Sequence, residues 1–240
     1  MAWYESAEGA ALFDSLQGEI AQLLSQRFGY LGVQVGAGGR GATLVELSRV
    51  RTYVLISSLA LPGCVQAIPA ALPLAAESAD LIVLAHVLEH APDPHQVLRE
   101  AERVLVPEGD VVIVSFDPLS LWGLWTWFNG TILHGNYAPW QGRFYSYFRV
   151  REWLNVLGFD LNAVRRLAIL PPSGNGRFRH KIEGMERIGR RWCAPLGGVR
   201  IITARKHRSG MILVRPAWKR NPAKAGVIAG NVSRSMSNDR

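Results

Sequence analysis

The clearest hydrophobic pattern of the chain covers residues 80–116. A short apolar run predicts a strand buried on both faces, and the polar segment after it, with two prolines, predicts a loop. Apolar residues then recur at helical spacing until Pro107 and Gly109 end the helix. Together these patterns predict a βαβ unit with a right-handed parallel crossover. Its parts are a strand Leu81–Ala85, a loop His86–Pro94, a helix from His95 and a strand Val111–Val114.

Hydrophobic spacing before this unit predicts one helix and three short strands. An apolar face at helical spacing predicts an amphipathic helix within Trp3–Phe28. Thr43 is placed to cap a second helix that carries the apolar residues of 44–47. Only about seven residues separate the second and third strands, too few for a normal parallel crossover, so either the connecting helix is reduced to a turn or the third strand is reduced. The predicted strands are Leu31–Val35, Arg51–Ile56 and Val65–Ile68.

The second half of the chain opens with an aromatic-rich insertion, at about 117–148. It follows the fifth strand, so it is expected at the carboxyl edge of the sheet, where a substrate lid would lie. The alternative, a second small core that packs the insertion onto the sheet, stays open. The later predicted elements are a helix Val150–Leu157, a strand Leu161–Leu170, a short helix Ile182–Trp192 and a final antiparallel edge strand Gly198–Ala204.

Length and charge divide the chain into a domain and a tail. A length of 240 residues favours one α/β domain, assigned to 1–204, with a basic, flexible tail at 205–240. The net charge is +8, and the tail carries nine basic residues against Asp239 alone, so the domain is neutral. Such a tail either holds RNA or anionic lipid weakly or only keeps the protein in solution. A neutral domain makes nucleic acid an unlikely partner.

Other compositional features narrow the class of protein. The two cysteines, Cys64 and Cys193, stand in unrelated contexts and indicate neither a metal cluster nor a disulfide framework. The N-terminus does not resemble a signal peptide, and no apolar run approaches the ~20 residues of a spanning helix. A cytoplasmic protein is therefore expected, with peripheral membrane contact left open.

A resemblance to a known family is carried by the text SADLIVLAHVLEH…DP…VLREAERVLVPEGDVVIV. It resembles the segment after the cofactor site in class I S-adenosylmethionine-dependent methyltransferases of the type 11 family. The resemblance implies an α/β, Rossmann-like, doubly wound and mostly parallel seven-stranded sheet, with S-adenosylmethionine as cofactor. The residues in the family's places are Ser78, Asp80, Leu88, Glu89, His90, Arg103, Leu105, Pro107 and Gly109.

The same resemblance implies where the cofactor would bind. Its first motif is the turn 36–41, whose glycines leave room for the amino-acid end of the cofactor. Family members carry acidic residues at three contacts where this chain has Gln34, Ser57 and Ile68. Because a hydrogen bond to a charged group contributes roughly 1.5–3 kcal/mol, these changes weaken the expected binding. The implied cofactor-binding residues are Gly36, Ala37, Gly38, Gly41, Ser57, Leu72, Ala85 and His86.

Candidate catalytic residues lie in the loop after the strand Leu81–Ala85. A neutral imidazole of His90 or His86 could act as general base toward a hydroxyl or an amine of the substrate. Alternatively, Glu89 and His90 only cap and orient the loop. No metal site is expected from this cluster.

Three hypotheses for the function follow. The first is S-adenosylmethionine-dependent methyl transfer to a small or lipid-like acceptor. The second is a non-catalytic binding or scaffold protein that kept the fold and lost the cofactor acids. The third is an RNA methyltransferase that uses the basic tail.

Overall fold

The computed structural model describes residues 7–36, 43–118, 142–167 and 198–207. Several sequence predictions lie outside these residues. They include Ala37, Gly38 and Gly41 of the glycine turn, most of the aromatic-rich insertion, the helix Ile182–Trp192 and the tail beyond residue 207.

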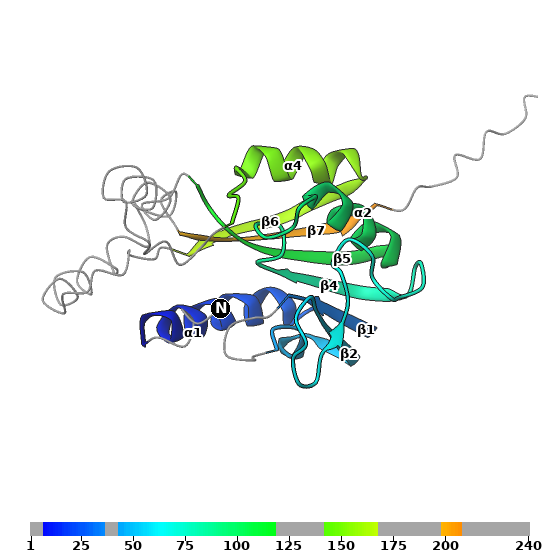
Figure 1. Ribbon diagram of the computed structural model, residues 1–240, viewed down its shortest axis with the longest axis horizontal. Helices are drawn as coiled ribbons and strands as arrows, with labels where there is room; N and C mark the ends of the chain where they lie inside the picture. The colour runs from blue at the N-terminus through cyan, green and yellow to red at the C-terminus, as the bar shows by residue number, and fades with distance from the viewer. Residues whose placement is uncertain (1–6, 37–42, 119–141, 168–197, 208–240) are drawn as a thin grey trace, which may run out of the picture. The chain divides into compact units, whose positions relative to one another are not determined.

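One seven-stranded sheet organises the described residues, in the order β3-β2-β1-β4-β5-β7-β6. The first five strands pair in parallel, whereas β7 pairs antiparallel with both β5 and β6. The predicted Rossmann-like, mostly parallel sheet is therefore confirmed (Figure 1). The strands are β1 (Phe28–Val35), β2 (Arg49–Ser57), β3 (Val65–Gln66), β4 (Ala79–Ala85), β5 (Leu105–Phe116), β6 (Phe159–Leu167) and β7 (Val199–Lys206).

Strand β4 lies at the centre of the sheet and is buried on both faces, as its continuous apolar sequence predicts. Leu81, Val83 and Ala85 point into one core, which also contains the buried residues of helix α1 (Ala7–Leu24). Ile82 and Leu84 point into the other core.

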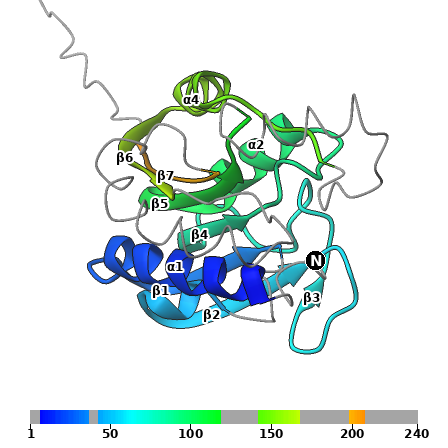
Figure 2. The ribbon, with the colours of Figure 1, turned by 90° about the vertical axis from the view of Figure 1, so that its left-hand side faces the viewer.

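Two helices cover that second face of the sheet. They are α2 (Pro94–Val104) and α4 (Tyr147–Val156), and both contribute apolar side chains to the same core as Ile82. Each begins at a capping side chain: Asp93 accepts a hydrogen bond from the Gln96 N–H, and Ser146 accepts one from the Arg149 N–H. Figure 2 shows α1 on one side of the sheet and α2 with α4 on the other.

In the N-terminal part, the amphipathic helix predicted within Trp3–Phe28 is confirmed, whereas the second predicted helix was wrong in its extent. Helix α1 ends at Leu24, and Phe28 opens β1, where its side chain is exposed at the strand's start. The helix expected after the glycine turn is only a single 3₁₀ turn, η3 (Val45–Leu47), with Leu44 rather than Thr43 at its cap. Thr43 therefore caps no α-helix.

Strand β3 contains only two residues, so the reduction of the third strand is confirmed. Ile68 lies outside it and is exposed. The last strand was predicted at the edge, but β7 lies between β5 and β6, and β6 forms the edge. A strand flanked on both sides is consistent with the uninterrupted burial of Val199–Ala204.

Strand β7 also extends two residues beyond the boundary predicted at Ala204, because ion pairs hold both residues. Arg205 donates to Asp110 on β5 at 3.1 and 3.2 Å, and Lys206 lies 2.9 Å from a carboxylate oxygen of Glu102. The hydrogen bond from Arg205 to Asp110 raises the pKa of the arginine. Both residues belong to the sheet and not to the tail. No helix among the described residues has the length and apolar character needed to cross a membrane.

Candidate functional site

The order of the strands reverses between β1 and β4, which is where ligands bind in open α/β sheets. Gly36 follows β1 at this point with a φ of +87°, and its N–H donates to the carbonyl oxygen of Ile56 at 2.9 Å. A Cβ atom at Gly36 would lie 2.4 Å from the carbonyl oxygen of Ala85. A residue with a Cβ atom would clash here, so only glycine allows the ends of the neighbouring strands β1 and β4 to lie this close together.

Gln34 has a structural role beneath this turn. Its side chain is buried, and its Oε1 accepts hydrogen bonds from the N–H groups of Leu44 at 2.7 Å and Val45 at 3.2 Å. These donors belong to the start of η3, so the amide oxygen caps this 3₁₀ turn. The residue that replaces the family's acid therefore holds the two ends of the glycine turn together.

Ser57 and Ile68 offer little to replace the other two acids. Ser57 is buried, and its Oγ already accepts a hydrogen bond from the Leu59 N–H at 3.1 Å. Ile68 is 69% exposed and carries no polar group. The side expected to hold the ribose and the adenine amine therefore has no carboxylate at these positions.

The segment expected to contact adenine is fixed by helix α2. Leu72 is buried, and its N–H donates to Glu100 Oε1 at 2.9 Å. Arg103 donates to the carbonyl oxygens of Leu72 and Leu74, at 3.3 and 2.9 Å, and pairs with Glu100 at 2.6 Å. The hydrogen bond from Arg103 lowers the pKa of Glu100. Sequence reasoning missed Glu100, whose only signal is a charged residue on the inward side of an amphipathic helix.

His86 follows β4 directly and is held in an unusual backbone conformation. Its φ is +52°, a region that residues other than glycine adopt rarely. The imidazole is buried and stacks on the Phe116 ring with centroids 4.2 Å apart. Its Nδ1 lies 3.3 Å from Glu89 Oε1. Residues held in strained conformations cluster at functional sites, so this position is consistent with a role in binding or catalysis.

Glu89 connects this histidine to two neighbouring segments. Its Oε1 also accepts a hydrogen bond from the Phe116 N–H at 2.8 Å, and its carbonyl oxygen accepts one from the Arg143 N–H at 2.8 Å. Its other carboxylate oxygen, Oε2, is buried and has no hydrogen bond to any described residue. A buried carboxylate oxygen of this kind is expected to have a partner.

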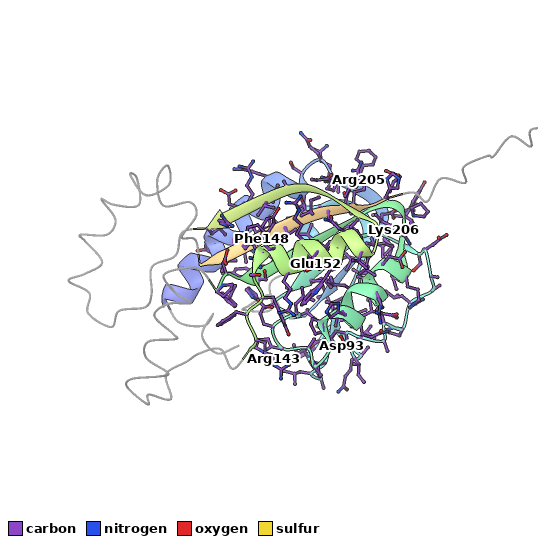
Figure 3. The ribbon with its side chains drawn as sticks, turned by 90° about the horizontal axis from the view of Figure 1, so that it is seen from above. Asp93, Arg143, Phe148, Glu152, Arg205 and Lys206 are labelled. Atoms are coloured by element: carbon purple, nitrogen blue, oxygen red, sulfur yellow. The ribbon has the colours of Figure 1, made fainter. Side chains whose placement is uncertain are left out.

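His90 points away from this arrangement. It is exposed and lines an open depression of about 320 Å³ together with Glu89, Ala91, Pro92 and Arg143. Figure 3 shows Arg143 on the same side of the molecule as Asp93, which caps α2. The structure therefore pairs the buried His86 with Glu89, whereas His90 is exposed beside Glu89 at the open depression. Among the described residues, no three His, Cys, Asp or Glu side chains are placed to share a metal ion.

A charged cluster beyond β5 was also missed from the sequence. Asp117 lies within ion-pair distance of Arg166 on β6 and of Arg200 on β7, at 3.4 and 3.5 Å. The one available signal was Arg200, a charged residue that stands between the apolar residues Val199 and Ile201 at the start of the strand.

The fold and the close approach of Gly36 to Ala85 define a Rossmann-like domain of the class I methyltransferase type. Comparison with known families agrees: residues 33–113 match the family described as "Methyltransferase domain". This match agrees with the family expected from the sequence.

Individual relatives extend the likeness. The chain is 37% identical over 131 residues to the uncharacterized protein YafS of Escherichia coli, which covers 55% of this chain and 53% of that protein. The chain thus spans about half the length of this curated relative.

Two solved structures share the fold. A SAM-dependent methyltransferase from Thermotoga maritima superposes with a TM-score of 0.57 at 19% identity, over 81% of this chain and 89% of its own. The 1,6-didemethyltoxoflavin-N1-methyltransferase of Burkholderia thailandensis, solved with its substrate and S-adenosylhomocysteine, gives 0.54 at 15% identity, over 85% and 84%. At such identities the likeness is one of fold.

Proposed function

We propose that this protein binds S-adenosylmethionine at the ends of β1, β2 and β4 and transfers its methyl group to a small or lipid-like acceptor. The observation that carries the proposal is the close approach of Gly36 to the backbone of Ala85, inside the segment that matches the methyltransferase domain. The comparisons support this cofactor and this class of reaction.

The described residues fit the cofactor in shape better than in charge. A side chain at Gly36 would clash with the carbonyl oxygen of Ala85, and Leu72 is fixed by Glu100 and Arg103 where an adenine contact is expected. Ser57 is buried, and its hydroxyl oxygen already accepts a hydrogen bond from the Leu59 N–H. When bound, S-adenosylmethionine supplies an activated methyl group on a sulfonium.

The chain's own contribution to such a reaction is alignment and the exclusion of water. His86 is the candidate that meets the acceptor, because it lies at the carboxyl end of β4 and its ring is fixed by Phe116 and Glu89. His90 is the second candidate, on the open side of the loop.

A non-catalytic role is the second hypothesis, and one observation favours it. The oxygen of Gln34 is occupied by Leu44 and Val45, and that of Ser57 by Leu59, so neither residue restores a lost carboxylate. A protein that kept the fold for binding alone would show the same pattern.

Calorimetric titration with S-adenosylmethionine and S-adenosylhomocysteine separates the two hypotheses. We expect a micromolar dissociation constant for the wild type and its loss in Gly38→Leu, which replaces a glycine that the family resemblance implies for cofactor binding. Gly18→Leu is the matched control, because no atom lies within 4 Å of a Cβ at Gly18 on α1. If folded wild-type protein shows no heat at millimolar ligand, the methyltransferase proposal is wrong.

A further inference from the structure

Three charged residues lie together at the carboxyl edge of the sheet, outside the cofactor site described above. Asp117 directly follows β5, and Arg200 is the second residue of β7. In the register of the sheet, Arg200 lies between Ser115 of β5 and Arg166 of β6. Because β5 and β6 both end here, the cluster shares the edge on which Gly36 and His86 lie.

Arg200 is completely buried and only partly hydrogen-bonded. Its Nη2 donates to the carbonyl oxygen of Tyr145 at 2.9 Å and to Ser115 Oγ at 3.3 Å. Its Nε and Nη1 have no hydrogen bond within the described part of the chain. Asp117 Oδ2 lies 3.5 Å from Nη1, which is close enough for an ion pair but too far for a good hydrogen bond.

Some N–H groups of the Arg200 guanidinium have no hydrogen-bond acceptor among the described residues. Burial lowers the pKa of this arginine and the charge of Arg166 lowers it further, whereas the charges of Asp117 and, more weakly, Glu89 raise it. Buried cations are normally paired and hydrogen-bonded, since an unmade bond to a buried charged donor is costly. A guanidinium with unused N–H groups therefore indicates a missing oxygen acceptor.

Arg166 is the partly exposed member of the cluster. Its side chain is 32% exposed, and its Nε lies 3.4 Å from the same Asp117 oxygen. Among the described residues, Asp117 is the one carboxylate within ion-pair distance of both guanidinium groups. Two cations sharing one anion can accommodate a second anion.

The position of the cluster fits an acceptor better than a cofactor. In an open α/β sheet, ligands bind at the carboxyl edge, and the strand reversal lies between β1 and β4. Arg200 on β7 lies two strands from β4, on the far side of β5. A molecule that meets the cofactor over β4 would extend toward this cluster.

We propose that Arg166 and Arg200 form an oxyanion subsite that binds a carboxylate or phosphate group of the methyl acceptor. The oxyanion accepts hydrogen bonds from the N–H groups of Arg200 that are unused within the described residues, and from Arg166. This subsite recognises the acceptor, and the methylated atom lies elsewhere on the molecule. That the bound anion belongs to a methyl acceptor rests on the proposed function, whereas the anion site itself does not depend on it.

The test uses the full-length protein and three probes: benzoate, phenyl phosphate and the neutral benzamide. Each is titrated with and without S-adenosylhomocysteine, and the arginine Nε–H resonances are followed by NMR. We expect at least one anion to bind, to shift the Arg200 resonance, and to bind more tightly than benzamide. The tighter of the two anions identifies carboxylate or phosphate as the natural group.

Variants separate recognition from folding. Arg166→Met is expected to weaken anion binding by about tenfold or more, with an unchanged affinity for S-adenosylhomocysteine and an unchanged melting temperature. Arg165→Met is the matched control, on the same strand with its side chain directed to the opposite face. Arg200→Met is also measured, provided that its circular dichroism shows a folded protein.

Two results would overturn the subsite. One is the absence of any Arg200 shift at high concentrations of both anions. The other is equal binding of benzamide and benzoate, or an equal loss in Arg166→Met and Arg165→Met. Anion binding by protein that does not bind S-adenosylhomocysteine would leave the subsite standing and reject the proposed function instead.

Discussion

Single residues show how this chain differs from the family it resembles. Gln34 replaces an acid that would face the cofactor, and its oxygen caps η3 through Leu44 and Val45. The cap matters because η3 is a single turn and cannot satisfy its own first N–H groups. The change from acid to amide therefore removes a charge but keeps a side-chain oxygen that caps η3.

The first prediction concerns this cap. Gln34→Leu removes the acceptor of two buried N–H groups and is expected to lower the free energy of unfolding by roughly 1–3 kcal/mol. Gln34→Glu keeps an acceptor oxygen in the same place and is the matched control. The measurement is urea denaturation followed by circular dichroism. Equal stabilities of Gln34→Leu and wild type would show that the cap contributes nothing.

Elements rather than single residues position the adenine side of the site. Helix α2 packs its apolar face on the sheet, and its Glu100 and Arg103 turn toward the segment 70–75. These two side chains satisfy the N–H of Leu72 and the carbonyl oxygens of Leu72 and Leu74. An irregular segment with few internal bonds is thus held by a regular helix.

The second prediction concerns the pH dependence of this contact. The pKa of Glu100 is lowered in the folded protein, chiefly by the hydrogen bond from Arg103. Its contribution to stability is therefore complete above the ordinary carboxyl pKa and is lost as the pH falls through the lowered value. We expect the stability of wild type to fall more steeply than that of Glu100→Gln when the pH is lowered from about 6 to about 3.

Denaturation midpoints across that pH range provide the measurement. Glu152→Gln is the control, because Glu152 is exposed on α4 and has no such partner among the described residues (Figure 3). We expect Glu152→Gln to follow the wild-type curve. If Glu100→Gln also follows it, Glu100 has no lowered pKa in the folded state.

At the scale of the molecule, most of the sheet could be predicted from the sequence. Buried parallel strands are continuous apolar runs, so β4 and the part Val111–Val114 of β5 were predicted, and a short connection predicted a reduced β3. The start of β5 at Leu105 was not predicted, because Pro107 and Gly109 indicated the end of a helix and not residues of a strand. The place of β7 between β5 and β6 could not be read, because an apolar run does not reveal how many neighbours a strand has. The same limit applied to the charged cluster, whose members come from three strands that are distant in sequence.

The candidate site was only partly predictable for a related reason. The position of Gly36 at the end of β1 follows from a recognisable motif, but the partners of Gln34, Glu89 and Arg200 are set by tertiary packing. His86 and His90 look equivalent in the sequence. The structure separates them, since one follows β4 in a left-handed conformation and the other lies on the open side of the loop.

The boundary between domain and tail leads to the third prediction. Arg205 and Lys206 are paired within the sheet, so their charges belong to the domain. Residues 210–240 form a unit separate from 1–209 and carry six basic residues against Asp239 alone. Each Lys or Arg near an anionic membrane contributes about 1 kcal/mol of attraction, which salt screens.

A chain that ends at Ser209 is expected to keep the melting temperature and the cofactor affinity of the full protein. Its binding to phosphatidylserine-containing vesicles should fall by at least about tenfold in a sedimentation assay, with no difference on phosphatidylcholine alone. A chain that ends at Ala204 is the control for the boundary, because it loses the pairs of Arg205 and Lys206 and should melt at a lower temperature. Equal vesicle binding by the full chain and by the chain ending at Ser209 would contradict a membrane role for the tail and favour one in solubility. A lower melting temperature of the Ser209 chain would show instead that the domain extends beyond residue 209, since the sheet would then depend on contacts made by the tail.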